Sequence, residues 1–183
     1  ARPMGFCIFG NVALGARYAL DRYGLSRVAI VDFDVHHGNG TQALLWDEPR
    51  VLTVTSQQMP LWPGTGYPSE TGAHGNVLNV PLVPGSGGIE MRETYERVVL
   101  PRLDEFAPEL LLISAGFDAH TADPLADLNW HEGDYTWLTQ ALCDVADAHC
   151  GGRLVSTLEG GYDLDALAAS VAAHVKVLTE RSG

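Results

Sequence analysis

Carboxylates and imidazoles gather in one short stretch of the sequence, VAIVDFDVHHGNG, which runs from Val28 to Gly40. The stretch opens as an apolar run typical of a buried strand and closes on polar residues before a Gly-Asn-Gly turn. Side chains alternate across an extended segment, so Asp32, Asp34 and His36 are expected to share one face. Asp34 and His36 then offer an oxygen and a nitrogen ligand to one point, which indicates a metal site. The alternative is a strand end capped by solvated polar residues, an explanation that suits a single Asp or His better than three aligned ones.

Two further apolar runs end in polar residues. Glu109 to Phe117 leads into Asp118, and Gly152 to Leu158 leads into a Glu-Gly-Gly-Tyr sequence. The carboxyl ends of parallel strands meet at one edge of a sheet, where open α/β folds place their sites, so Asp118 is expected beside Asp34 and His36. Two carboxylates and one imidazole neutralise a divalent ion and leave a position open for water and substrate. Zinc fits best, and iron, manganese and cobalt are also compatible.

These positions require elements that bring the strand ends together. Short apolar runs alternate with amphipathic stretches, which favours an α/β fold, and runs such as LLLISAGF lack the polar alternation of a one-sided antiparallel sheet. A parallel sheet is therefore expected. Further strands are predicted at Val51 to Thr55 and Asn76 to Leu82. Helices are predicted at Asn11 to Tyr23, Thr41 to Trp46, Ile89 to Phe106 with a kink at Pro101, Glu132 to His149, and Leu164 to Thr179.

A long segment rich in Gly and Pro, Gln57 to Gly75, fits neither a helix nor a strand. A loop of that length inside a compact domain is usually functional. Its aromatic and Pro residues indicate a pocket wall. The alternative is a surface loop that merely buries Trp62.

Composition sets bounds on the class of protein. With 183 residues, of which 46% are hydrophobic, the chain is long enough for one well-filled core, so residues 1–183 are expected to form a single domain. The net charge of −12 and the lack of a basic cluster argue against direct nucleic-acid binding. No apolar stretch reaches the ~20 residues of a membrane helix. Cys7, Cys143 and Cys150 have no CxxC spacing, which predicts reduced thiols and a cytoplasmic location. The chain starts at Ala1, which looks like an interior starting point, and nothing specifies an oligomeric state.

Five motifs together carry a family resemblance. DFDVHHGNGT, LWPGTG, NVPL, SAGFDAHTADPL and LEGGYD, in that order, resemble the zinc-dependent histone deacetylase and acetylpolyamine amidohydrolase family. The resemblance implies the arginase/deacetylase fold, a three-layer α/β structure with helices on both faces of a parallel sheet. It also implies hydrolysis of an acetylated amine, either acetyl-lysine in a protein or an acetylpolyamine, with one zinc ion per site and a structural potassium ion.

Carried over by position, the family's zinc ligands fall on Asp34, His36 and Asp118. Its catalytic tyrosine falls on Tyr162, whose hydroxyl polarises the acetyl carbonyl and stabilises the oxyanion, and removing such a donor typically costs about 10²–10³ in turnover. Without the family, Tyr162 would be interpreted as a half-buried loop aromatic. Asp32 resembles the carboxylate that orients a catalytic histidine.

The resemblance also implies a potassium site and a substrate tunnel. The potassium ligands correspond to Asp32, Asp34, His36 and Thr55, the last standing where serine is usual. A narrow apolar tunnel suits a methylene chain, whose burial is worth roughly 0.8 kcal/mol per CH₂. For Phe6 the alternative of core packing stays open. The tunnel residues correspond to Gly5, Phe6, Trp62, Leu125, Gly160 and Gly161.

One departure from the family pattern is an absence. The family's Gly-His-His segment, with its general-base histidine, lies just upstream of the GFC motif, and this sequence starts too late to contain it. The chain is therefore expected to be the C-terminal portion of a longer enzyme, truncated at the N-terminus. General acid–base catalysis contributes about 10²–10⁴-fold, so the chain alone is expected to bind metal at best and to turn over poorly. The histidines outside the site are expected to be surface or packing residues: His37, His74, His120, His131, His149 and His174.

Other features bear on subtype and on competing functions. Asn39 and Leu125 resemble the class II and bacterial branch, and the physiological substrate is not specified. An arginase-like binuclear manganese hydrolase would need further carboxylates where Gly38 and His120 stand, so a single metal is favoured. The other alternative is a non-catalytic metal-binding module without the general-base histidines.

Overall fold

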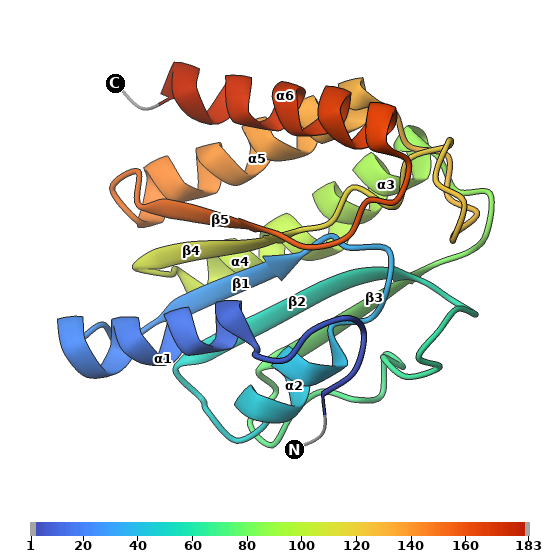
Figure 1. Cartoon of the computed structure of the whole chain (residues 1–183). Helices are drawn as coiled ribbons and strands as arrows, with labels where there is room; N and C mark the ends of the chain where they lie inside the picture. The colour runs from blue at the N-terminus through green and yellow to red at the C-terminus, as the bar shows by residue number, and fades with distance from the viewer. Residues whose placement is uncertain (1–2, 182–183) are drawn as a thin grey trace.

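The computed structural model of this chain describes residues 3–181 and has a five-stranded sheet between layers of helices (Figure 1). Every neighbouring pair of strands is parallel, so the predicted parallel sheet is confirmed. In the sheet order β3-β2-β1-β4-β5, the strand that leads into the Asp/His motif is central. The strands are β1 (Val28–Asp32), β2 (Val51–Gln58), β3 (Val77–Leu82), β4 (Leu110–Ala115) and β5 (Leu154–Leu158).

Helices cover both faces of the sheet, as the predicted three-layer arrangement requires. Alternate residues of β1 serve the two faces: Val28 and Ile30 pack toward one helical layer, and Ala29 and Val31 pack toward the other. The first layer holds α1 (Asn11–Tyr23) and α2 (Asn39–Leu45). The second holds α3 (Gly88–Thr94), the π-helical turn η1 (Tyr95–Val99), α4 (Leu100–Phe106), α5 (Glu132–His149) and α6 (Leu164–Arg181).

The predicted helix from Ile89 to Phe106 is broken into three pieces. A π-helical turn over Tyr95–Val99 separates α3 from α4. Pro101, which stands at the start of α4, has no backbone N–H and its ring crowds the carbonyl four residues earlier. The widened turn just before Pro101 therefore replaces the predicted kink.

Strand β2 runs three residues past its predicted end at Thr55. The added residues are polar but buried, and each has a partner from a distant segment. Ser56 shares a hydrogen bond of 2.8 Å with the hydroxyl of Tyr95, and Gln57 donates to the carbonyl of Gly66 at 2.7 Å. These long-range partners explain why a local sequence pattern ends the strand too early.

The two edges of the sheet differ in exposure. Along β3 the side chains are buried or half-buried, whereas β5 exposes Val155 and Leu158. The cysteines are unpaired, in agreement with the predicted reduced thiols, with Cys7 exposed and Cys143 and Cys150 buried. Within residues 3–181, none of the helices combines the length and the apolar character needed to cross a bilayer.

Candidate metal centre and active site

The carboxyl ends of β1 and β4 bring Asp34, His36 and Asp118 together. Their candidate ligand atoms all lie within 4.8 Å of one another. Nδ1 of His36 is 3.0 Å from Oδ2 of Asp118 and 3.1 Å from Oδ1 of Asp34. The residues that the strand ends single out therefore form one cluster in space, while their role as metal ligands stays a prediction.

The backbone reaches this geometry by leaving the strand. β1 ends at Asp32, yet the predicted alternation continues, because Phe33 and Val35 pack in the same core cluster as Ala29 and Val31. The amide of Asp34 donates to Oδ1 of Asp32 at 3.1 Å, and the amide of His36 donates to Oδ1 of Asp34 at 2.8 Å. The amide of Val35 donates to Oδ1 of Asp118 at 2.9 Å. Carboxylates thus accept from the N–H groups that the strand ladder no longer pairs.

The electrostatics of the cluster favour a bound cation. Asp118 is fully buried, and that burial, followed by the charge of Asp34, raises its pKa to about 7 despite the hydrogen bond from His36. Burial lowers the pKa of His36, but the bonds to Asp118 and Asp34 outweigh it and raise the pKa to about 10. The cluster therefore holds on to protons, because within residues 3–181 none of its carboxylates pairs with an arginine or a lysine.

Two more carboxylates lie close by. Asp32 is buried, and desolvation, followed by the charges of Asp34 and Glu159, raises its pKa well above the usual range. Burial, offset in part by a hydrogen bond from Ser114, also raises the pKa of Glu159, which accepts from the hydroxyl of Ser114 at 2.9 Å. In the part of the chain that the structure describes, neither these carboxylates nor those of Asp34 and Asp118 form an ion pair with an arginine or a lysine.

Glycines let the backbone close around the acidic side chains. A Cβ on Gly160 would collide with Oδ2 of Asp118 and would lie 2.6 Å from Oδ2 of Asp34. A Cβ on Gly116 would collide with Asp34 as well. In exchange, the amide of Gly160 donates to Oδ2 of Asp34 at 2.8 Å. Because these glycines have no Cβ, the backbone lies close to the two carboxylates. The carboxylate oxygens and the imidazole of His36 form a donor set that fits a divalent cation.

Aromatic rings surround His36. Its ring centroid lies 6.1 Å from that of Trp62 and 6.4 Å from that of Tyr162, and Phe6 meets Tyr162 edge-on at 6.1 Å. Phe6 is 89% exposed, so the alternative that it packs in the core is wrong. Trp62 is 50% exposed, which also excludes a loop that merely buries it. Both rings are therefore free to contact a ligand that reaches His36.

The remaining predicted tunnel residues border the same region. Gly5 has a left-handed backbone, and a Cβ there would lie 3.1 Å from the ring of Trp62. Gly161 has φ of +140°, which favours glycine, and a Cβ there would lie 2.6 Å from Leu167. Leu125 is exposed. The tunnel role of these residues stays a prediction.

Tyr162 carries the hydroxyl group of the site. It is 36% exposed, and its pKa is raised by burial and then by the charges of Asp118 and Asp34. The hydroxyl therefore keeps its proton at neutral pH and remains a hydrogen-bond donor. A donor is what a developing oxyanion requires.

The predicted potassium site includes Asp32, the last residue of β1. In the sheet, Asp32 is in register with Thr55 on β2 and with Ser114 on β4. Thr55 is buried, and a Cβ on Gly38 would collide with Oδ2 of Asp32. Hydroxyl and carboxylate oxygens are therefore neighbours, as the prediction needs, while potassium binding itself stays a prediction.

A second group of residues also has ligand-like spacing: His120, His131 and Glu132. The amide of Ala122 donates to Nδ1 of His120 at 3.1 Å. Nε2 lies 3.6 Å from Oε1 of Glu132, too far for a hydrogen bond, and has no hydrogen-bond partner among the residues that the structure describes. His131 in this group is exposed, whereas each residue of the strand-end cluster is buried or half-buried, so the strand-end cluster is the more enclosed of the two.

The other histidines have partners away from the cluster. Both ring nitrogens of His37 are hydrogen-bonded, to Thr65 at 2.8 Å and to Gln42 at 2.9 Å. His74 pairs with Asp47, His149 with Asp104, and His174 with Thr139 and Ser156. Within residues 3–181, none of them is placed as a general base beside Asp34 and His36.

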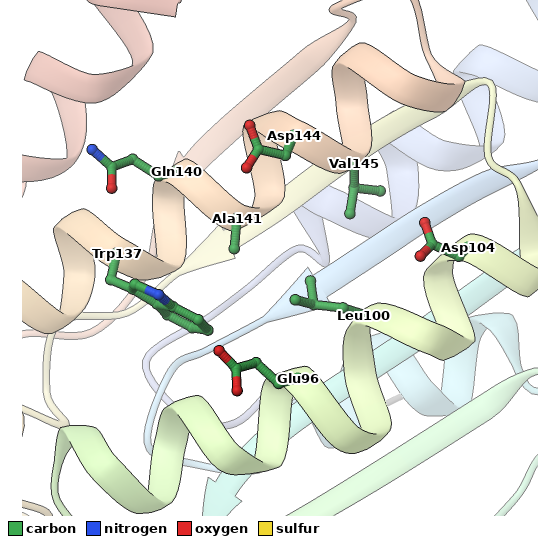
Figure 2. A pocket seen from close by; sticks show the side chains of 8 residues that line it. All are labelled: Glu96, Leu100, Asp104, Trp137, Gln140, Ala141, Asp144 and Val145. Carbon is green, nitrogen blue, oxygen red and sulfur yellow. The ribbon is translucent and has the colours of Figure 1, made fainter.

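A groove of about 410 Å³ lies elsewhere, between η1–α4 and α5 (Figure 2). Trp137, Leu100 and Val145 supply its apolar wall, and acidic residues border it. Two of those acids have basic partners: Asp104 pairs with His149 and Asp144 with Arg181. The acids of the groove are all exposed, whereas Asp118 at the strand ends is fully buried.

Sequence reasoning did not single out three residues that shape the site: Gly116, Ser114 and Asp123. Gly116 directly follows β4 and precedes Asp118 by two positions, so its place between an apolar run and an acid was a usable signal. Ser114 points to Glu159 from another strand, and Asp123 contacts the Tyr162 amide 39 residues away. Those two pairings carry no local signal.

Comparison with known proteins gives consistent results. Residues 1–178 match the histone deacetylase domain family. The chain is 46% identical over 173 residues to "Histone deacetylase 10, chloroplastic" of Oryza sativa subsp. japonica, covering 93% of this chain and 39% of that protein. It is 43% identical over 166 residues to "Histone deacetylase-like amidohydrolase" of Pseudomonas aeruginosa, covering 88% of this chain and 43% of the relative.

Solved structures agree with the sequence comparison. The HDA15 HD domain superposes with a TM-score of 0.92 at 38% identity, covering 99% of this chain and 52% of that one. The chain therefore spans about half the length of the relatives it matches.

Proposed function

The chain belongs to the histone deacetylase domain family, and from that membership we propose that its strand-end cluster hydrolyses the acetyl amide of an acetylated amine. The observation that supports this most is the convergence of Asp34, His36 and Asp118 within 4.8 Å beside the ring of Tyr162. The proposed substrates are acetyl-lysine in proteins and acetylated polyamines, both of which carry an acetamide at the end of a methylene chain.

Asp34, His36 and Asp118 would hold one zinc ion. Such an ion supplies a Lewis acid that polarises the carbonyl and activates a water molecule. The carboxylates of Asp34 and Asp118 would supply the negative charge that a dication needs, and the dication would displace the proton that the raised pKa of Asp118 retains. One ion rather than an arginase-like pair of manganese ions is supported by Gly38 and His120, which stand where such a pair would need further carboxylates.

Tyr162 would donate a hydrogen bond to the oxygen that gains negative charge when the acetyl carbon becomes tetrahedral. Its raised pKa keeps the hydroxyl protonated for this task. Phe6 and Trp62 would contact the methylene chain, since their exposed rings lie around the cluster. Each CH₂ buried between such rings contributes about 0.8 kcal/mol.

The site as described contains no histidine that could accept a proton from the attacking water. We therefore expect the 183-residue chain alone to bind zinc and to turn over poorly, because a general base contributes about 10²–10⁴-fold. The matched relatives are about twice this length or longer, and we propose that the base comes from a part of the full-length protein upstream of this segment.

The test is to measure zinc content and turnover of an acetyl-lysine peptide with this chain and with the chain extended upstream. Stoichiometric zinc in both proteins, with turnover only in the extended one, is the expected result. Turnover by this chain at a rate typical of whole enzymes would contradict the expected need for an upstream base. Stoichiometric zinc without turnover in either protein would favour the non-catalytic binding module.

Substitution of the tyrosine gives a separate prediction. In the active form, Tyr162→Phe removes only the hydroxyl donor, so kcat is expected to fall by about 10²–10³ while zinc content stays unchanged. Tyr67→Phe, on an exposed loop tyrosine, is the matched control. Equal activity in the two variants would remove Tyr162 from the proposed mechanism.

A further inference from the structure

We propose that Asp123 is the residue that positions Tyr162, an inference that rests on the proposed deacetylase function. Asp123 is 7% exposed and carries a carboxylate whose two oxygens are both used. Oδ2 accepts from the amide of Tyr162 at 2.8 Å, and Oδ1 accepts from the amide of Leu125 at 2.9 Å. One buried side chain therefore joins Tyr162 to Leu125, which lies in the loop between β4 and α5.

The tyrosine segment, residues 159–163, lies between β5 and α6 and forms neither strand nor helix. Before the tyrosine, the amide of Gly160 donates to Oδ2 of Asp34 at 2.8 Å, and its carbonyl accepts from the amide of Phe117 at 2.8 Å. After the tyrosine, the chain enters α6. Between these anchors the chain turns at residue 161, where φ is +140°, and a hydrogen bond to Asp123 holds the backbone of Tyr162 itself.

The loop that carries Asp123 is itself well anchored. The amide of Asp123 donates to the carbonyl of His120 at 2.9 Å, and the amide of Thr121 donates to the carbonyl of Trp130 at 2.9 Å. The same loop begins at Asp118, which is fully buried in the cluster. Asp123 thus holds the backbone of Tyr162 against an anchored loop. Charge-assisted hydrogen bonds to backbone N–H groups are roughly twice as strong as neutral ones.

Accurate placement of Tyr162 matters because its ring has only edge contacts. Its centroid lies 6.1 Å from that of Phe6, an exposed ring, and 6.4 Å from that of His36. A hydroxyl that must meet an oxyanion within hydrogen-bond distance loses its effect when displaced, and a misplacement of about 1 Å can cost on the order of 10²-fold in rate. Asp123 therefore acts on the reaction through Tyr162 and does not touch the substrate.

Asp123→Asn tests this with little change in size. Asparagine offers one acceptor oxygen, so only one of the two amides keeps its partner while an NH₂ group faces the other. In the form of the protein that turns over, kcat is expected to fall by about 10–100-fold, with little change in KM and an unchanged zinc content. Asp163→Asn is the matched control. Oδ1 of Asp163 caps α6 through the amide of Ala166 at 2.8 Å, and asparagine caps a helix as well as aspartate does.

Two readouts separate positioning from general structural damage. Amide hydrogen exchange of Tyr162 is expected to accelerate in Asp123→Asn but not in Asp163→Asn, and this can be measured without zinc or substrate. In a Tyr162→Phe background, Asp123→Asn is expected to lower kcat no further, because the hydroxyl it positions is already gone.

The outcomes distinguish this inference from the proposed function. Unchanged protection of the Tyr162 amide in Asp123→Asn, or an undiminished loss of kcat in the Tyr162→Phe background, overturns the positioning role while the deacetylase proposal stands. Unchanged turnover in Tyr162→Phe itself overturns the role of Tyr162 and, with it, that of Asp123.

Discussion

Carboxylates gather in two regions of this molecule, at the strand ends of β1 and β4 and along the groove between α4 and α5. In the groove, Asp104 pairs with His149 and Asp144 with Arg181, and all of these side chains are at least partly exposed. At the strand ends, Asp118 is fully buried and contacts His36, and within residues 3–181 it forms no ion pair with an arginine or a lysine. Acids of the groove are exposed and pair with basic side chains, whereas the acids at the strand ends outnumber the basic groups beside them.

This difference distinguishes exposed acids that pair with basic side chains from buried acids that outnumber such partners. Exposed ion pairs cost and contribute little, since solvent screens them. Desolvation, followed by the charge of Asp34, raises the pKa values of Asp32, Asp118 and Glu159, and acids held in this way destabilise the folded chain. Strongly perturbed groups of this kind cluster at functional sites. We therefore attribute the strand-end acids to cation binding and those of the groove to surface pairing.

The largest expected effect comes from removing a buried acid. In Asp118→Asn, zinc affinity is expected to fall by more than the roughly 100-fold that loss of an outer-shell partner costs. The thermal midpoint of the metal-free chain is expected not to fall, because repulsion with Asp34 is relieved. Metal analysis after dialysis and thermal unfolding with a chelator measure the two effects. Full retention of zinc by Asp118→Asn would contradict the proposal that the strand-end acids bind the ion.

Burial also sets the charge of His174, whose ring packs 5.7 Å from that of Phe117. Burial lowers its pKa from 6.5 to about 4. Between these values the unfolded chain binds a proton that the folded chain does not, so stability is expected to fall as the pH drops from 6.5 to 4. At about 1.4 kcal/mol per unit, the loss approaches roughly 3 kcal/mol.

Urea unfolding at a series of pH values measures this loss, with His174→Gln as the comparison. The variant is expected to have a shallower dependence below pH 6.5. Parallel curves for the two proteins would show that the pKa of His174 is not lowered in the folded chain.

Substitution of Gly160, which lies against the two carboxylates, is expected to have a smaller effect on zinc affinity. In Gly160→Ala the added methyl displaces Asp118 and Asp34, so zinc affinity is expected to fall by about 10–100-fold. Gly133→Ala is the control, since a Cβ there meets nothing within 4 Å and the position lies in α5. Calorimetric titration with zinc should separate the two variants. Equal affinities would mean that the backbone near residue 160 relaxes freely.

The smallest effect is expected in the groove. Asp144→Asn breaks the exposed pair with Arg181, and the free energy of unfolding is expected to change by less than about 1 kcal/mol. Zinc affinity should be unchanged. A loss of zinc in this variant would show that the two acidic regions are linked, and denaturant titration with metal analysis would reveal it.

The sequence predicts most of the elements because their signals are local. The helices at 11–23 and 132–149 have the predicted bounds, since apolar spacing and terminal residues lie within each segment. The end of β2 was predicted too early because Gln57 and Ser56 find partners at Gly66 and Tyr95. The π-helical turn was missed because widening of a helix leaves no sign in the apolar spacing.

The site also has residues that local sequence predicts and residues that it does not. Asp34, His36 and Asp118 could be predicted because each follows an apolar run, and parallel strands end at one edge. The turn that aims Asp34 and His36 could not, because it depends on an oxygen of Asp118 more than 80 residues away. Asp123 was hidden for the same reason, since its partner belongs to another segment.

The bond from the Gly160 amide to Oδ2 of Asp34 joins the tyrosine segment to the ion cluster. Two sites that share a structural element have a coupling free energy, and that quantity is reciprocal. If zinc binding raises the affinity of residues 159–163 for a ligand by some factor, that ligand raises the affinity for zinc by the same factor. A ligand with that positive coupling should therefore lower the fraction of zinc that a chelator removes at equilibrium, even if it does not touch the ion.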